Sequence, residues 1–117
     1  MTLVDTSVWV DHIRRGNPTV KKLLNDGEVL IHPFIIGELA CGNIRNRSEI
    51  LRLLDELPKA IVAENSEVLK FVERNRLFGL GIGWIDVHLI ASAVLSHSTM
   101  LTIDKALRDV FKRLTTL

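Results

Sequence analysis

The chain has 117 residues, with 15 Lys and Arg against 14 Asp and Glu, so its formal net charge is +1. This length predicts one domain spanning residues 1–117, and the near-zero charge argues against a protein that binds nucleic acid by bulk electrostatics alone. The single Cys excludes a disulfide framework, and the absence of Tyr beside four Phe and two Trp argues against an aromatic surface that stacks bases.

Taken in chain order, short apolar runs, helical periodicities and Gly or Pro breaks predict strands that alternate with helices. The first half is expected to hold a strand at 2–4, a helix at 8–13 that ends at Gly16, a helix from Pro18 to Gly27 capped by Asn17, a strand at 28–31 and a helix from Pro33 to about Gly42. The second half is expected to hold a helix at 50–57 capped by Ser48, a strand at 60–63, a helix capped by Ser66 with Val68, Leu69 and Val72 facing inward, a loop at 79–83, a buried helix at 85–95, a strand at 99–103, a helix at 106–111 and an edge strand at 114–117.

This alternation implies crossover connections between parallel strands. We therefore expect an α/β fold, a three-layer α/β/α sandwich with a mainly parallel sheet of about five strands. Residues 87–103 lack Asp, Glu, Lys and Arg but include His, Ser and Thr, and a membrane span needs about 20 mostly apolar residues. No signal pattern opens the chain, so we expect a cytoplasmic protein without a membrane segment.

Four acidic residues stand out by their positions. Asp5 and Asp104 each follow a predicted strand, which places both at the carboxyl edge of the sheet, where open α/β folds bind ligands. Glu38 lies within an apolar predicted helix, and Asp86 begins another. Ionised carboxylates are rare in such settings unless they are paired or bound to a cation. Four together would raise one another's pKa, a cost that a hard cation such as Mg²⁺ or Mn²⁺ removes.

Three of these acids also have a purely structural explanation. Asp5 and Asp104 are suitable N-caps for the helices that follow them, and the helix dipole favours Asp86 near a helix N-terminus. Glu38 has no such explanation, because it falls in mid-helix. From the residues alone, a shared metal site and separate helix caps both stay open.

Four blocks of the sequence resemble those of PIN domains. They are LVDTSVWVD at 3–11, GEL at 37–39, GIGWID at 81–86 followed by LIASA at 89–93, and LTIDK at 101–105. The resemblance covers essentially the whole chain in the order of the family, and it is strongest to the VapC-like toxins of prokaryotic toxin–antitoxin pairs. The DTSVW and GIGW-x-D segments are its most specific parts.

The resemblance implies a Mg²⁺- or Mn²⁺-dependent endoribonuclease whose metal ligands and catalytic residues are Asp5, Glu38, Asp86 and Asp104. It also implies an RNA substrate, a homodimer, and a small cognate VapB-like antitoxin that inhibits the enzyme. No Ser/His/Asp grouping and no zinc-type spacing is evident, so a metal-activated water is the expected nucleophile, and the cation would also hold the leaving 3′ oxygen. One metal ion and two are both compatible with the sequence.

Other polar residues are expected to support this pocket or to lie outside it. Thr6, Ser7 and Thr102 are candidates for orienting the acidic ligands by hydrogen bonds, with helix capping as the alternative for Ser7. Asp11 is expected beyond the metal, in a supporting or structural position. The histidines are expected to pack or to face solvent rather than to act in catalysis; they are His12, His32, His88 and His97.

Basic and apolar residues predict the partner surfaces. Arg14, Arg15, Arg45 and Arg47 are the candidate phosphate contacts for RNA, because they follow the helices that carry acidic blocks, although solvated charge is the default for Arg. The apolar side chains of 50–57, with those of Val20, Leu23 and Leu24, either pack on the sheet or form a groove for an amphipathic antitoxin helix. A dimer would use a separate surface.

Two other function classes remain open at this point. A Mg²⁺-binding phosphotransfer domain of the receiver type also clusters acids at strand ends, but it does not need an acid in the helix that holds Glu38. A catalytically silent α/β protein-interaction module would normally lack one or more of the four acids. Metal-dependent activity separates these classes, because Asp86→Asn should abolish catalysis but leave partner binding intact.

Overall fold

The computed structural model describes residues 1–116, and the sheet within them has three strands in the order β2-β1-β3. These are β1 (Thr2–Val4), β2 (Val29–Leu30) and β3 (Thr99–Leu101). Both pairings are parallel, with Leu3 opposite Leu30 on one side and Met100 on the other. Parallel neighbours require crossover connections, and here helices supply them, as the alternating sequence pattern predicts.

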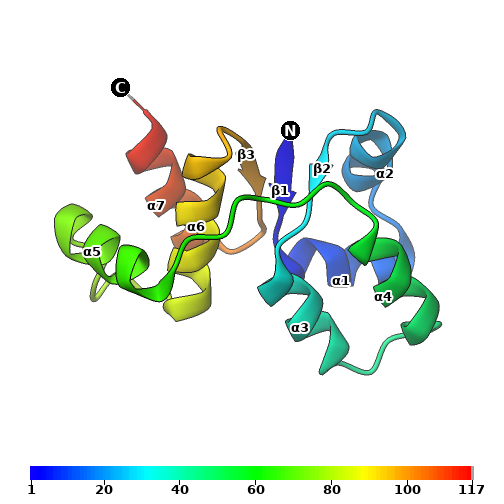
Figure 1. Cartoon of the computed structure of the whole chain (residues 1–117). Coiled ribbons are helices and arrows are strands. Elements are labelled where there is room, and N and C mark those ends of the chain that lie inside the picture. Colours follow the sequence, from blue (N-terminus) through cyan, green and yellow to red (C-terminus); the bar gives the residue numbers. More distant parts are fainter. Residues whose placement is uncertain (117) are drawn as a thin grey trace.

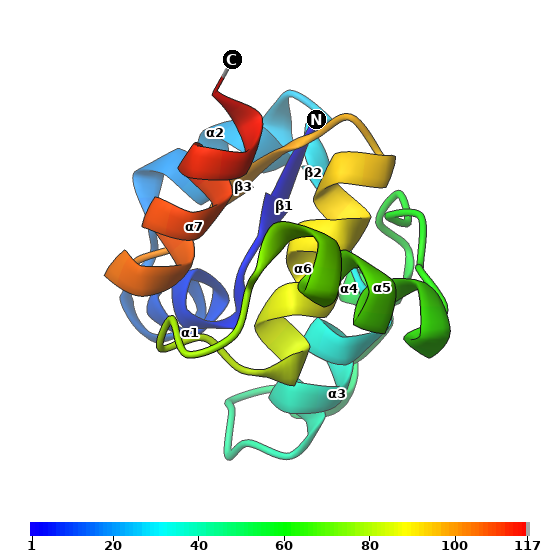
Figure 2. The ribbon, with the colours of Figure 1, turned by 90° about the vertical axis from the view of Figure 1, so that its left-hand side faces the viewer.

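Seven helices accompany the sheet in the described part of the chain. They are α1 (Thr6–Arg15), α2 (Pro18–Asn25), α3 (Pro33–Ala40), α4 (Arg47–Asp55), α5 (Asn65–Asn75), α6 (Trp84–Leu95) and α7 (Lys105–Thr115). The sheet lies in the middle, with α2 and α7 on one side and α5 and α6 on the other (Figure 2). The three-layer α/β/α fold is therefore confirmed, although the sheet is narrower than the five strands expected.

Helix α6 lies at the centre of the core. Every side chain from Val87 to Ala93 is buried, and the helix packs against both β1 and β3. Leu89 and Ala93 join one apolar cluster with β1, β2, α1 and α3, whereas Ile90 and Ala91 join a second cluster with α5 and α7. The near-uniform apolar character of this helix, which predicted burial on several sides, follows from its place between the two clusters.

Two predicted strands are wrong. Only one bridge, between Ile31 and Lys59, extends the sheet near 60–63, because the chain then turns toward α6, where Ser96 Oγ accepts from the Ile61 backbone N–H at 2.8 Å. Residues 114 and 115 are helical and continue α7, since Leu107, Val110 and Leu114 repeat at helical spacing and pack in one cluster. Residue 117 lies outside the described part.

Smaller differences concern helix starts and one side chain. Helix α4 follows Asn46 rather than Ser48. Helix α5 follows Glu64 rather than Ser66, and the Glu67 carboxylate accepts from the Glu64 N–H at 3.0 Å. The Leu69 side chain, expected to face inward, is 57% exposed.

No helix in residues 1–116 combines the length and the apolar character needed to cross a bilayer.

Candidate active site

Four helices begin near the carboxyl edge of the sheet. They are α1, α3, α6 and α7. The strands run from the end of the molecule marked N toward α1 and α3, and α6 also begins at that lower end (Figure 1). Asp5 follows β1 directly, Asp104 comes shortly after β3, and Asp86 lies in the first turn of α6. Helix N-termini carry unpaired N–H groups and a partial positive charge, so this edge favours anions.

Asp5 is the most deeply buried of the four acids and accepts the most hydrogen bonds. Its side chain is 8% exposed. One oxygen, Oδ1, accepts from the Thr6 backbone N–H at 2.8 Å, and the other, Oδ2, accepts from Ser7 Oγ at 2.9 Å and from Thr102 Oγ1 at 2.8 Å. The three donors are all neutral, so they fix the carboxylate in place without cancelling its charge.

Thr102 connects two of the predicted ligands. Its buried hydroxyl donates to Asp5 and accepts from the Asp104 backbone N–H at 3.0 Å. The Asp104 side chain is exposed and caps α7 by accepting from the Leu107 N–H at 3.1 Å. The capping explanation of Asp5 and Asp104 is therefore correct as a statement of local geometry, and the same geometry holds both carboxylates at one edge.

Asp86 is half-buried, and the charges of neighbouring acids act on its pKa. Burial raises its pKa above the usual value, and the negative charges of Asp5 and Asp104 raise it further. A hydrogen bond from the Gly83 backbone N–H to Oδ2, at 3.0 Å, acts in the opposite direction. Asp86 therefore lies near enough to Asp5 and Asp104 for their negative charges to disfavour its ionised form.

Glu38 reaches the same edge from α3. The expected apolar surroundings are wrong, because the side chain is exposed while Ile35 and Leu39 of the helix are buried. Its Oε1 accepts from Thr6 Oγ1 at 2.6 Å. Thr6 thus donates to two acids, through its hydroxyl to Glu38 and through its backbone N–H to Asp5.

The four carboxylates have no cationic partner among the ion pairs of residues 1–116. The described residues also hold no group of three or more His, Cys, Asp or Glu side chains placed to share one metal ion. Four oxygen-donor carboxylates with uncompensated charge are nevertheless the ligand type that Mg²⁺ and Mn²⁺ prefer. The residues therefore fit a hard divalent cation by their chemistry and their location.

Asp11 has a different set of contacts from the four acids. Its carboxylate accepts from Arg15 Nε at 2.6 Å and from Asn17 Nδ2 at 3.0 Å. These hydrogen bonds hold its pKa below the usual value. The side chain joins the end of α1 to the start of α2, which is the structural position expected for it.

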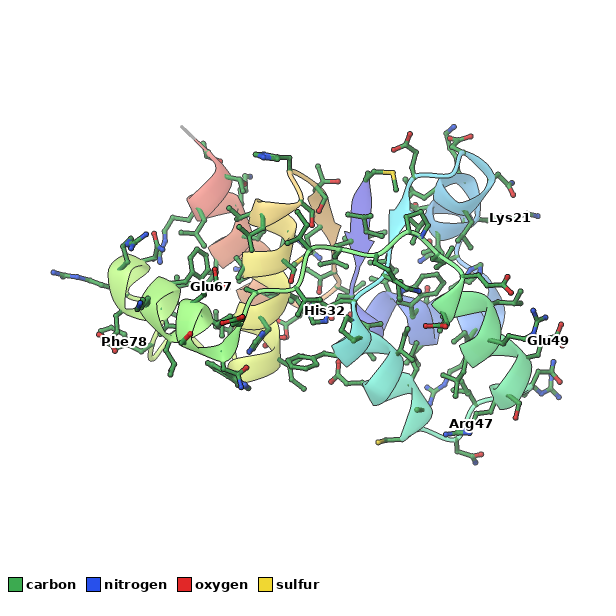
Figure 3. All side chains as sticks on the ribbon, viewed as in Figure 1. Lys21, His32, Arg47, Glu49, Glu67 and Phe78 are labelled. Atoms are coloured by element: carbon green, nitrogen blue, oxygen red, sulfur yellow. The ribbon has the colours of Figure 1, made fainter. Side chains whose placement is uncertain are left out.

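Two buried histidines contact aromatic side chains near this edge. The His88 ring lies 4.5 Å from that of Trp84 and 4.8 Å from that of Phe34, and the Phe34 ring lies 5.0 Å from that of His32. Burial, and then the charge of His88, lower the pKa of His32 to about 4, and burial also lowers the pKa of His88. Both imidazoles are therefore neutral packing groups near pH 7, as expected, and His32 lies in the middle of the molecule (Figure 3).

The four predicted phosphate contacts separate into two pairs. Arg15 binds Asp11, and Arg47 donates twice to the Ala40 carbonyl, at 3.0 and 2.8 Å, at the junction of α3 and α4 (Figure 3). Arg14 and Arg45 instead line one cavity of about 300 Å³ beside Glu38 and Thr6. The structure thus brings only two of the four arginines, Arg14 and Arg45, into a cavity that Glu38 also lines.

Two residues of this region were not predicted as part of the site. Phe34 and Cys41 line an open hollow of about 600 Å³ together with Glu38 and Trp84. The Trp84 side chain is 42% exposed. Only Trp84 carried a signal in the sequence, as part of the GIGW segment, whereas Phe34 and Cys41 reach the hollow through the packing of α3 against α6.

Comparisons with known proteins identify the family of the chain. The family model described as "PIN domain" matches residues 2–112. The proteins named "Ribonuclease VapC32" from two Mycobacterium tuberculosis strains, CDC 1551 / Oshkosh and ATCC 25618 / H37Rv, are each 42% identical to the chain over 109 residues, covering 92% of this chain and 88% of each relative. The matched segment contains all four acids and the three hydroxyl residues that contact them. The chain therefore belongs to the PIN domain family, and within it is similar to the VapC proteins.

Proposed function

We propose that the chain is a metal-dependent endoribonuclease that acts as the toxin of a toxin–antitoxin pair. The relatives that are 42% identical carry the name ribonuclease. The observation that carries the proposal is the buried Asp5 carboxylate, fixed by three neutral donors beside Asp86, whose pKa burial and neighbouring acids raise. Carboxylates that are fixed by neutral donors and have no cationic partner suit a cation site better than they suit a packed core.

In this proposal Asp5, Glu38, Asp86 and Asp104 hold Mg²⁺ or Mn²⁺. When bound, such an ion would supply an activated water and neutralise charge that develops on the phosphate. The chain's own groups orient the ligands, with Thr102 and Ser7 holding Asp5 and Thr6 holding Glu38. The N-termini of α1, α6 and α7 stabilise the negative charge of Asp5, Asp86 and Asp104 at the same edge.

The test is cleavage of a mixed cellular RNA pool by the purified chain with Mg²⁺, with Mn²⁺ and with EDTA. We expect discrete fragments only with metal. Asp86→Asn should reduce the rate more than about 100-fold, because even groups that only support a ligand contribute about 10- to 100-fold. Asp109→Asn is the matched control, because Asp109 pairs with Lys105 at 3.0 Å on the surface. Equal cleavage in EDTA, or by the Asp86 variant, would reject the proposal.

The antitoxin is proposed to bind a groove between α1, α2 and α4. This groove of about 250 Å³ is almost wholly apolar and is lined by Trp9, His12, Ile13, Leu24, Ile50, Leu53, Leu54 and Leu57. Leu53 is 47% exposed although it belongs to an apolar helix face, as expected where an amphipathic helix docks. Leu53→Glu should relieve inhibition by a co-expressed antitoxin, whereas Phe78→Glu, at the opposite end of the molecule (Figure 3), should not.

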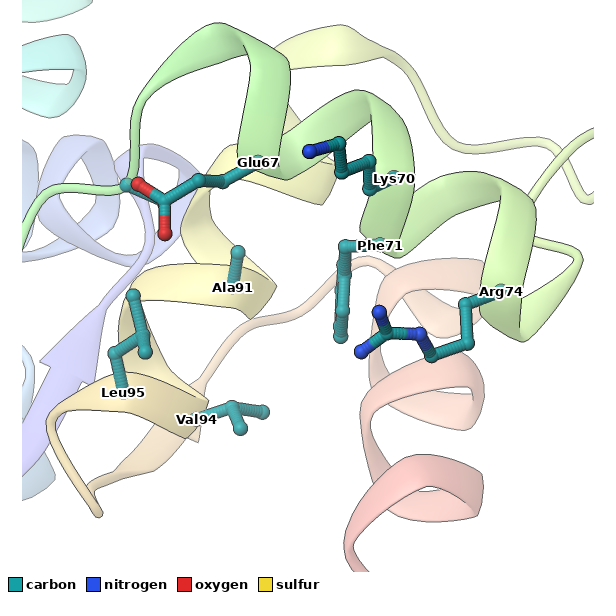
Figure 4. A pocket seen from close by; sticks show the side chains of 8 residues that line it. Glu67, Lys70, Phe71, Arg74, Ala91, Val94 and Leu95 are labelled. Carbon is teal, nitrogen blue, oxygen red and sulfur yellow. The ribbon is translucent and has the colours of Figure 1, made fainter.

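The homodimer is proposed to form through the α5–α6 face. Ile61, Val62, Val94 and Leu95 are each at least 40% exposed there. A pocket lies between α5 and α6 on this face. Glu67, Lys70 and Arg74 line it from α5, and Val94 and Leu95 line it from α6 (Figure 4). This order of charges is self-complementary, because a two-fold axis that sets α5 antiparallel to its copy places Glu67 opposite Arg74 of the second copy.

Charge exchange tests this surface. Glu67→Arg and Arg74→Glu should each weaken the dimer in sedimentation equilibrium, because like charges would then face each other. The double variant should restore it. A monomeric native chain, or a double variant as weak as the single ones, would reject the proposed interface.

A further inference from the structure

The cavity beside Glu38 has an apolar interior and a polar rim. It lies between α1, the end of α3 and the loop that leads to α4, and it encloses about 300 Å³. Val10, Ile13, Leu39 and Ile44 supply the apolar lining. This volume is at the lower end of the range of about 300–1,000 Å³ found for small-molecule pockets, so the space suits a single ring system rather than a long segment of a partner.

The rim of the same cavity carries positive charge and an amide. Arg14 reaches it from α1, and Asn43 and Arg45 reach it from the loop after α3. Neither guanidinium makes a hydrogen bond or an ion pair within residues 1–116, in contrast to Arg15 and Arg47. A guanidinium that is not committed to the fold can offer its planar donors to a phosphate.

The cavity is continuous with the acidic site. Thr6 and Glu38, which are hydrogen-bonded to each other at 2.6 Å, form part of its lining. Arg14 also lines a second, adjacent hollow beside α1, together with Ser7, Asp11 and Ile103. An RNA chain that crosses the acidic edge would therefore pass Arg14 on its way into the cavity.

We infer that this cavity is a nucleotide subsite, which holds one base of a single-stranded RNA next to the bond that is cut. The apolar lining receives the base, Asn43 is placed to hydrogen-bond with the edge of the base, and Arg14 and Arg45 bind the phosphates on either side. Bases of single-stranded RNA can be splayed from their neighbours to enter such a pocket. The inference rests on the proposed ribonuclease function and names the residues that position its substrate.

Binding is measured without cleavage, on the Asp86→Asn protein in EDTA. The probes are fluorescent eight-nucleotide oligoribonucleotides of U, A and C, and an abasic ribose-phosphate chain of the same length. Arg14→Ala and Arg45→Ala should each weaken binding about 10-fold and lower the slope of log affinity against log salt by about 0.7, as expected for the loss of one phosphate contact. Arg52→Ala, an exposed arginine of α4 that pairs with Glu56 at 3.1 Å, is the control and should change neither quantity.

Ile44→Ala tests the placement of the base. It should weaken binding of at least one base-containing probe about fivefold, because it removes apolar surface from the cavity, and it should leave the abasic probe unchanged. Thermal melts establish that each variant is folded. Equal losses for the Arg52 control and the two cavity arginines, or an Ile44 effect that is the same with the abasic chain, would overturn the subsite.

The outcomes for the subsite and for the nuclease are separable. If the native chain fails to cut RNA with metal while the Arg14, Arg45 and Ile44 effects hold, the nuclease is rejected and the nucleotide site stands. If cleavage depends on metal and on Asp86 while those three variants bind like the control, the subsite is rejected and the nuclease stands.

Discussion

The acids on the helix surfaces and the acids at the sheet edge have different partners. On the surface, charges lie four residues apart on one helix face, as in Lys22–Asp26, Arg52–Glu56 and Lys105–Asp109, all with N–O distances of about 3 Å. At the edge, the four carboxylates meet backbone N–H groups and hydroxyls instead.

This difference separates acids that have a cationic partner from acids that have only neutral donors. An exposed ion pair contributes only about 0–1 kcal/mol and can be lost without consequence. The edge acids carry like charges at one place, and their neutral donors fix the oxygens without cancelling the charge. The partner of an acid therefore says more about its role than its type or its exposure.

Removing a hydroxyl at the edge should have the largest effect among the changes that leave all four acids in place. Thr102→Val keeps the shape of the side chain but removes the donor to Asp5 and the acceptor for the Asp104 N–H. Cleavage and metal affinity should fall about 10- to 100-fold, and stability should fall by about 1–3 kcal/mol, because a buried polar group loses its partner. Metal titration and chemical denaturation measure the two effects.

The same strand supplies the control for this change. Thr99 lies at the other end of β3, where its hydroxyl shares an exposed hydrogen bond with that of Thr2 at 2.8 Å. Thr99→Val should leave metal affinity and cleavage unchanged. Equal losses in the two variants would show that Thr102 matters only to the strand and not to the acids.

The sequence predicted the location of the acids better than their surroundings. Asp5 and Asp104 could be placed because parallel strands end at one edge, a consequence of chain direction alone. Nothing local indicates that Glu38 is exposed, because that depends on which face of α3 packs on α1 and α6. The same holds for Arg47, whose bond to the Ala40 carbonyl requires the turn between α3 and α4.

The fold was predicted with the same limits. Helix α6 was identified by composition, since a helix that is apolar on nearly every side must be buried. The run at 60–63 has strand-like composition, but β2 is only two residues long and pairing stops after the bridge to Lys59. Pairing depends on the length of a neighbour that is distant in sequence, and composition does not report it.

A smaller effect is expected from the hydroxyl that holds Glu38. Thr6→Ala removes the donor to Glu38 but keeps the backbone N–H that binds Asp5. Metal affinity and cleavage should fall about 10-fold, the lower end of the range for groups that orient a ligand. Thr6→Ser keeps the hydroxyl and should restore most of the activity. If Ser does no better than Ala, the hydrogen bond to Glu38 has no part in the site.

The smallest effect concerns stability without metal, and its sign separates the two kinds of acid. The pKa of Asp86 is raised in the folded chain, so folding favours its neutral form: this stabilisation is complete below the unfolded pKa and is lost as pH rises through the folded pKa. In EDTA at pH 7, Asp86→Asn should therefore raise the melting temperature, by no more than about 4 °C because solvent screens a half-buried group. The gain should disappear below about pH 4, where Asp is protonated in both states.

Asp109→Asn removes half of an ion pair and should leave the melting temperature unchanged or slightly lower at pH 7. A lower melting temperature for Asp86→Asn at that pH would mean that the edge acids stabilise the fold as the surface acids do, and the contrast between the two regions would fail.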